Sequence, residues 1–136
     1  MQRPRDLDVV GVIAVGGAVG SVARYGLQRA VPHDDPASFA WATFLTNVSG
    51  CLLIGVLMWL VLEVWGPRRY ARPFLGIGVL GGFTTFSTYA VEAQGMARAD
   101  AWGTAAAYVA LSVVLGLLAV RSGYWLGRLL ATARRT

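Results

Sequence analysis

The chain has 136 residues, a formal net charge of +5 and a hydrophobic content of 56%, and only 14% of its residues are charged. Because a soluble domain carries about a quarter charged residues, this composition excludes an ordinary soluble domain. All twelve basic residues are arginines that flank apolar stretches. This distribution is typical of contact with the headgroups of membrane lipids and excludes nucleic acid as a partner.

Four apolar stretches predict four membrane spans, at about 9–30, 39–63, 71–96 and 101–127. Each is long enough to cross a hydrocarbon core of about 30 Å at about 1.5 Å per residue. We therefore expect an all-α integral membrane protein with four transmembrane helices in one domain. The acidic residues beside Arg3 and Arg5 and the glycines of the first stretch argue against a cleaved signal peptide.

Glycines spaced four residues apart recur in these spans, in the pairs Gly16/Gly20, Gly78/Gly82 and Gly123/Gly127. Small residues at this spacing let two helix backbones approach closely inside a membrane. The pairs therefore predict tight helix packing and indicate no chemistry of their own.

Side chains that carry catalytic chemistry are few in this sequence. The one histidine, His33, lies in a connector, and the one cysteine, Cys51, lies in the middle of the second span. Glu63 and Glu92 lie near the ends of spans, and we assign no role to them. Without a pair of groups suited to catalysis, the sequence does not predict an enzyme.

The arginines lie unevenly on the two sides of the membrane. The side with both termini and the second connector has eight: Arg3, Arg5, Arg68, Arg69, Arg72, Arg128, Arg134 and Arg135. The opposite side has three, Arg24, Arg29 and Arg98, and Arg121 lies within the fourth span and is not counted. Since arginine-rich ends stay in the cytoplasm, we expect a multi-pass protein of the cell membrane with both termini cytoplasmic.

The third span contains the segment Gly81-Gly82-Phe83-Thr84-Thr85-Phe86-Ser87-Thr88-Tyr89. Two glycines followed by two β-branched threonines weaken a helix at its centre. A broken helix would expose backbone carbonyls and amides that can bind ions. The alternative is a kinked helix whose hydroxyls bond back to carbonyls one turn earlier.

Polar side chains occur at similar depth in the second and fourth spans, at Asn47, Tyr108 and Ser112. Uncharged amides and hydroxyls inside a bundle suit either an ion path or hydrogen bonds between helices. Asn47 is the more costly of these groups to bury, so it is the better functional candidate.

Three motifs carry a family resemblance: Gly16-Gly17-x-x-Gly20-x-x-x-Arg24-Tyr25, Thr43-x-x-x-Asn47-x-x-Gly50 and Gly81-Gly82-Phe83-Thr84-Thr85-Phe86-Ser87-Thr88. With the fourth span, they resemble the Fluc (CrcB) fluoride-channel family over the whole chain. The resemblance implies an antiparallel dimer of four-helix subunits with a broken third helix and two pores. It also implies a structural Na⁺ at the dimer centre.

The resemblance implies a role for each matching position. Backbone carbonyls of Gly81 and Thr84 would hold the Na⁺. The side chains implied for the fluoride pore are Asn47, Phe86, Tyr89, Thr85, Tyr108, Ser112 and Arg24.

Two positions depart from the family pattern. The second pore aromatic, usually phenylalanine, is Tyr89 here, and the position one turn beyond Ser112, often a hydroxyl residue, is Gly116. The tyrosine adds a hydroxyl to the electropositive ring edge, whereas the glycine removes a potential ligand from the polar track.

The implied function is passive, fluoride-selective export that protects the cell from fluoride toxicity. The arginine bias favours a subunit that inserts one way and pairs with an oppositely oriented paralogue, and a homodimer is the alternative. Two other functions are a small proton-coupled multidrug exporter and a non-transporting membrane assembly protein. The exporter needs a carboxylate in the first span, where residues 9–23 have none.

Overall fold

The computed structural model describes residues 4–64 and 68–132, and within these ranges it is all helical. Arg3, Arg134 and Arg135 lie outside the described residues. The helices are α1 (Pro4–Ala30), α2 (Trp41–Trp59), η1 (Leu60–Val64), η2 (Pro73–Leu80), α3 (Gly81–Phe83), α4 (Phe86–Arg98) and α5 (Trp102–Thr132).

Four helical rods are long and apolar enough to cross a membrane: Leu7–Ala30, Trp41–Val64, Pro73–Arg98 and Trp102–Leu130. The second rod joins α2 to the π-helical η1, and the third contains η2, α3 and α4. The predicted fold class, all-α with four membrane-length helices, is confirmed, and the chain is a multi-pass membrane protein.

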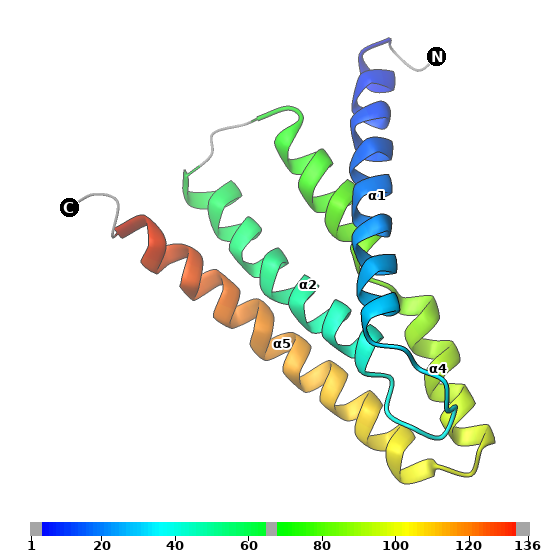
Figure 1. Cartoon of the computed structure of the whole chain (residues 1–136). Helices are drawn as coiled ribbons and strands as arrows, with labels where there is room; N and C mark the ends of the chain where they lie inside the picture. The colour runs from blue at the N-terminus through cyan, green and yellow to red at the C-terminus, as the bar shows by residue number, and fades with distance from the viewer. Residues whose placement is uncertain (1–3, 65–67, 133–136) are drawn as a thin grey trace.

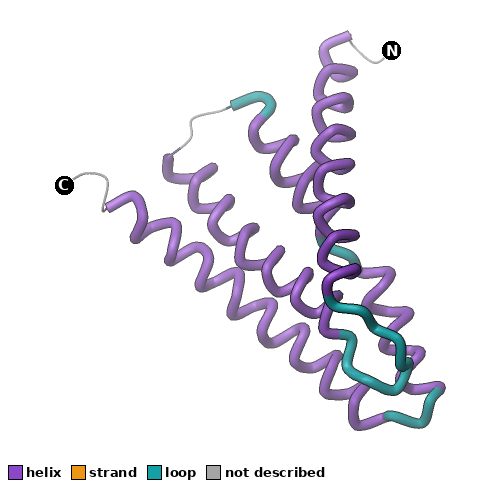
Figure 2. The backbone as a smooth tube through the Cα atoms, in the orientation of Figure 1, coloured by secondary structure: helices purple, strands orange, loops and turns teal. Residues whose placement is uncertain are grey.

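The rods form a V (Figures 1 and 2). One arm holds α1 packed against η2 and α3, and the other holds α2 beside α5, which runs parallel to it. At the closed end, α4 packs against α5. The buried core lies there and consists of Ala40, Phe44, Met96, Ala105 and Tyr108.

Glycines bring α1 into contact with the third rod. A Cβ added to Gly20 would lie 2.0 Å from the carbonyl oxygen of Val79, and one added to Gly82 would lie 2.4 Å from that of Gly17. Neither glycine has room for a side chain, because the two backbones touch there. The predicted close packing of glycine pairs is confirmed at this crossing.

A second glycine crossing fixes α2 against α5. A Cβ on Gly55 would lie 2.1 Å from Val120 O, and one on Gly123 would lie 2.0 Å from Leu52 O. Gly127 lies against a side chain instead, since a Cβ there would be 3.0 Å from the ring of Trp59. These contacts repeat along both helices, so they set one register between α2 and α5.

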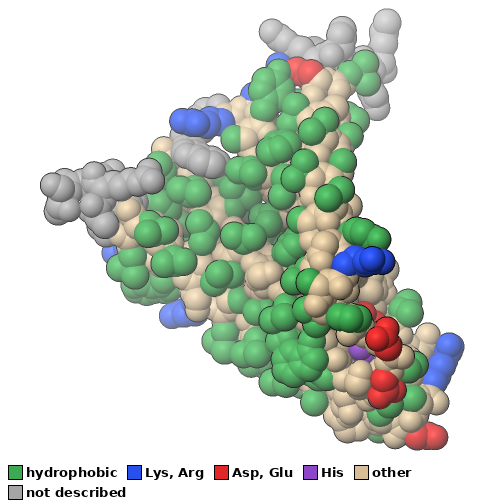
Figure 3. Space-filling model, in the orientation of Figure 1, with side chains coloured by type: hydrophobic (Ala, Val, Ile, Leu, Met, Phe, Trp, Pro, Cys, Tyr) green, Lys and Arg blue, Asp and Glu red, His purple; other side chains and the backbone are tan. Residues whose placement is uncertain are grey.

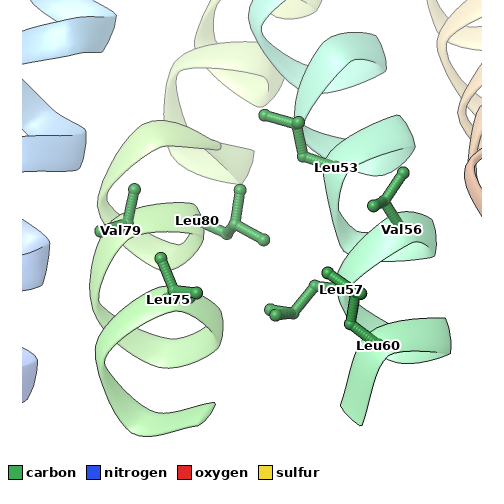
Figure 4. Close-up of a pocket in the computed structure, with 7 residues that line it drawn as sticks. All are labelled: Leu53, Val56, Leu57, Leu60, Leu75, Val79 and Leu80. Atoms are coloured by element: carbon green, nitrogen blue, oxygen red, sulfur yellow. The ribbon is translucent and has the colours of Figure 1, made fainter. Parts of the chain in front are cut away.

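On the face shown in Figure 3, hydrophobic side chains are spread along the length of the rods. Exposed hydrophobic side chains of the rods include Val22, Val91 and Leu117. Between the arms of the V lies an apolar pocket of about 220 Å³ (Figure 4). Its lining residues are Leu53, Val56, Leu57, Leu60, Leu75, Val79 and Leu80. Such surfaces suit contact with lipid or with another subunit.

Gly20→Ala should lower the thermal unfolding midpoint of the protein in detergent. Overpacking of this kind costs about 1–3 kcal/mol, and here the new methyl group would meet backbone, which cannot move aside. Gly26→Ala is the matched control on the same helix, since a Cβ there has no neighbour within 4 Å. Equal midpoints for the two variants would contradict the proposed crossing.

Candidate functional site

The third rod is interrupted between α3 and α4. Thr84 has φ −75° and ψ 155°, and Thr85 has φ −146° and ψ 124°, so both residues are extended. Thr85 is nevertheless buried, with 7% of its surface exposed. Backbone groups that leave a helix inside a membrane need other partners, because no water is available there to bond them.

Asn47 supplies these partners for Thr85. Its Nδ2 donates to Thr85 O at 2.9 Å, and its Oδ1 accepts from the Thr85 N–H at 2.9 Å. The side-chain amide thus pairs with a backbone residue as a neighbouring strand would. In this structure, the residue implied for the pore stabilises the interruption directly.

Thr85 also begins the helix that follows. Its Oγ1 accepts a hydrogen bond from the Thr88 N–H at 3.2 Å and lies 3.0 Å from the Thr88 hydroxyl. This is an N-cap, which satisfies one of the amide groups that a helix start leaves unpaired. The Thr85 side chain therefore caps α4, while its backbone is hydrogen-bonded to Asn47 of α2.

α1 contacts the interruption from the other side. Arg24 Nη1 donates to Thr84 O at 3.4 Å, and Ser21 Oγ donates to Gly82 O at 3.5 Å. The half-buried guanidinium places a permanent positive charge beside the interruption. Such a charge raises the local concentration of anions.

The two residues implied for sodium differ in their surroundings. In a continuous helix the Thr85 N–H would reach Gly81 O, but here it donates to Asn47, so the Gly81 carbonyl is released. Thr84 O instead accepts from Arg24, whose charge opposes a cation at that oxygen. Among the described residues, no cluster of three His, Cys, Asp or Glu side chains is present. A metal would therefore bind backbone oxygens, and Gly81 fits this role better than Thr84.

Glu92 is the centre of a second polar cluster, which joins three helices. Thr43 Oγ1 donates to Glu92 Oε1 at 2.9 Å, and Tyr108 OH donates to Glu92 Oε2 at 2.8 Å. Both donors are fully buried. We name Thr43, Glu92 and Tyr108 the hydroxyl–carboxylate triad. Hydrogen bonds to a charged group are about twice as strong as neutral ones, so the triad stabilises the contact of α2, α4 and α5.

Our expectation that Glu92 has no role was wrong. Its position near the end of a span suggested a boundary residue, but the carboxylate points into the bundle and accepts from two buried hydroxyls. One signal in the sequence could have indicated this. Phe86, Tyr89 and Glu92 are spaced three apart, so they share one face of α4.

An aromatic row leads from the surface to the triad. The ring centroids of Phe86 and Tyr89 are 5.8 Å apart, those of Tyr89 and Tyr108 are 5.2 Å apart, and Phe39 meets Tyr108 edge-on at 5.2 Å. The row begins at Phe86, which is 80% exposed. Of the residues implied for the pore, Tyr89 and Tyr108 are thus brought together, whereas Phe86 points away from the rest of the chain.

The α2–α5 polar seam consists of Thr43, Asn47 and Cys51 on α2 and of Tyr108, Ser112 and Gly116 on α5. Successive members on each helix are four residues apart, and the helices run parallel. The triad joins Thr43 to Tyr108, and a Cβ on Gly116 would lie 3.5 Å from Cys51 Sγ. This register puts Asn47 level with Ser112, whose buried hydroxyl oxygen has no hydrogen-bond partner in the described part of the chain.

The fold and the site together define a four-helix membrane protein with a broken third span and a row of uncharged polar groups inside the bundle. Comparison with known proteins agrees with this class. Residues 11–124 match the family described as CrcB-like protein, Camphor Resistance (CrcB), and the chain belongs to that family. The predicted family membership is confirmed.

The chain is similar to several proteins named as fluoride-specific ion channels. It is 49% identical over 105 residues to FluC 2 of Streptomyces avermitilis, which covers 77% of this chain and 66% of that protein. It is 43% identical over 120 residues to FluC 2 of Nocardia farcinica, covering 88% and 85%. It is 45% identical over 121 residues to FluC 1 of Streptomyces coelicolor, covering 88% and 77%.

Asn47→Ala should destabilise the protein. It leaves the N–H and the carbonyl of Thr85 unpaired, and each unpaired buried group costs about 1–3 kcal/mol. Ser49→Ala is the control on the same helix, because Ser49 Oγ bonds only to carbonyls of its own helix. Thermal unfolding in detergent measures both, and similar midpoints would show that the amide does not support the interruption.

Proposed function

We propose that this chain is the subunit of a fluoride-specific ion channel that lets fluoride leave the cell passively and so protects the cell from fluoride toxicity. The observation that carries the proposal is the row of hydroxyl and amide groups buried between α2, α4 and α5 in a membrane-spanning chain. The names of the relatives, fluoride-specific ion channel FluC, support the choice of ion.

The polar seam suits a small hard anion. Fluoride must exchange its water for donors in the protein, and hydroxyl and amide N–H groups are such donors. Several weak sites in series allow the ion to enter and to leave again. The electropositive ring edges of Phe86 and Tyr89 add further favourable contacts at the surface end of the row.

Glu92 orients the donors in this scheme. A carboxylate repels an anion directly, so its contribution lies in the two hydroxyls that it holds. With Thr43 and Tyr108 both bonded to Glu92, their oxygen atoms keep fixed positions on the wall of the seam. An arriving anion then competes with the carboxylate for those protons, which keeps its binding weak.

The channel is proposed to be a dimer, since one chain leaves the pathway incomplete. Phe86 is 80% exposed, and among the described residues its aromatic neighbour is Tyr89, which supports a second subunit covering it. The carbonyls at the interruption support the same arrangement. The Gly81 carbonyl and a Thr84 carbonyl that already accepts from Arg24 offer few oxygen atoms for Na⁺ in one chain, and hard cations bind several oxygen atoms at once. Two antiparallel copies would supply them jointly.

The partner is proposed to be an oppositely oriented paralogue, with both termini of this chain in the cytoplasm. Eight arginines on the side of the termini against three on the other side favour one orientation. One relative's species, Streptomyces avermitilis, has both a FluC 2 and a FluC 3 similar to this chain, which supports pairs of paralogues.

Thr43→Val should reduce fluoride efflux from liposomes at least about tenfold, because it removes one hydroxyl of the triad while keeping the shape of the side chain. Thr46→Val is a closely matched control. Thr46 is also fully buried on α2, but its hydroxyl bonds back to Ala42 O, away from the seam. Chloride serves as the control ion.

Fluoride-selective efflux from the wild type, lost in Thr43→Val and kept in Thr46→Val, would support the proposed pathway. Equal loss in both variants would place the pathway elsewhere. If the wild type gives no fluoride efflux either alone or after reconstitution with a paralogue, the proposed fluoride function is wrong.

The orientation predicts where a C-terminal reporter is active. A reporter that works only in the cytoplasm should give a strong signal when fused after the last residue, and one that works only outside should give little. Replacing Arg68 and Arg69 by glutamine should weaken the preference for this orientation. The substitution removes two of the positive charges that keep the second connector in the cytoplasm. Strong signals from both reporters in the wild type would rule out a fixed orientation and favour the homodimer.

A further inference from the structure

The polar seam ends, one turn beyond Ser112, at a cysteine that faces a glycine. Cys51 follows Asn47 by four residues on α2, and Gly116 follows Ser112 by four residues on α5. The nearest atom to a Cβ built on Gly116 is Cys51 Sγ, at 3.5 Å. The thiol therefore borders the space that a side chain at position 116 would enter.

Ser112 offers an unpaired hydroxyl to this part of the seam. Its hydroxyl oxygen is buried, and no partner reaches it among residues 4–64 and 68–132. In contrast, Thr46, Ser49 and Thr84 bond back to carbonyls of their own rods. A buried hydroxyl without a partner costs about 1–3 kcal/mol, so its persistence in a folded protein calls for a function.

We propose that the Cys51 thiol lines the ion pathway beside Ser112 and takes the place, in this chain, of a hydroxyl at position 116. This inference rests on the proposed fluoride function and extends it by one residue. A thiol is a weak donor and a polarizable group, so it contributes a weaker contact to a small anion than a hydroxyl does. The turn of the seam beyond Ser112 thus keeps one polar group, the Cys51 thiol, although Gly116 has no side chain.

Efflux from liposomes tests whether the thiol contributes to the pathway. Cys51→Ala should lower fluoride efflux about threefold or more, the effect of one lost hydrogen bond, and Cys51→Ser should keep it. Adding Gly116→Ser to Cys51→Ala should restore efflux, since the serine Cβ fits at an ordinary contact distance. Wild-type efflux from Cys51→Ala, or no restoration by Gly116→Ser, would overturn the proposal.

Reaction of the thiol with methyl methanethiosulfonate gives a second test. The thiolate displaces methanesulfinate and forms a disulfide to the methylthio group, which would fill the seam. Because the sequence has a single cysteine, the wild type is modified at one site only. Modification should abolish fluoride efflux, and reduction with dithiothreitol should restore it. Full efflux from the modified protein would overturn the proposal.

The matched control is Val114→Cys in the Cys51→Ala background. Val114 lies between Ser112 and Gly116 in the sequence, on the outer face of α5, and is 52% exposed. The outer face of a membrane-spanning helix contacts lipid, whereas the proposed pathway holds water. Thiolates form where water reaches, so Cys51 should react at least about tenfold faster than a thiol at position 114. The rate comes from mass spectrometry and needs no ion flux. Absence of fluoride efflux from the wild type would therefore count against the fluoride function. Equal modification rates for Cys51 and for the cysteine at position 114 would count against the role of Cys51.

Discussion

The pairing of Asn47 with Thr85 is the interaction on which the rest of the structure depends. A helix can be interrupted inside a membrane only if the backbone groups at the interruption find partners in the protein. One side-chain amide provides both partners here, at 2.9 Å each. It thereby ties the start of α4 to α2 and releases the Gly81 carbonyl. It also fixes the direction in which Phe86, Tyr89 and Glu92 leave the interruption.

The glycine crossings make this pairing possible. α1 lies against the third rod with backbone in contact with backbone, so Arg24 and Ser21 reach the carbonyls of Thr84 and Gly82. On the other arm, Gly55 and Gly123 set the register of α2 against α5. The same register brings Thr43 and Tyr108 to one carboxylate. The glycine contacts therefore also decide which polar groups meet, because a shift of one helical turn would pair each member of the seam with a different partner.

A single chain contains most of the groups of the proposed pathway but leaves part of them uncovered. The hydroxyl–carboxylate triad is complete within the chain, whereas Phe86, at the end of the aromatic row, and the apolar outer faces are exposed. This division is consistent with the proposal that two subunits share each pathway. It also explains why Tyr89 and Gly116, the two departures from the family pattern, matter for this chain. Tyr89 packs on Tyr108 in the row, and Gly116 lies against the Cys51 thiol.

The sequence by itself determined the membrane class, the four rods, the glycine pairs and the family, because hydropathy and small-residue spacing act locally along a helix. Asn47 was also identified from the sequence, since burying an amide in a membrane is costly without a purpose.

The tertiary structure decided which groups meet. Glu92 looked like a boundary residue until α2 and α5 brought Thr43 and Tyr108 to it. The contact of Cys51 with Gly116 and the isolation of the Ser112 hydroxyl likewise depend on the register between α2 and α5. Local patterns do not contain that register, because it is set by backbone contacts between residues about 65 positions apart in the chain.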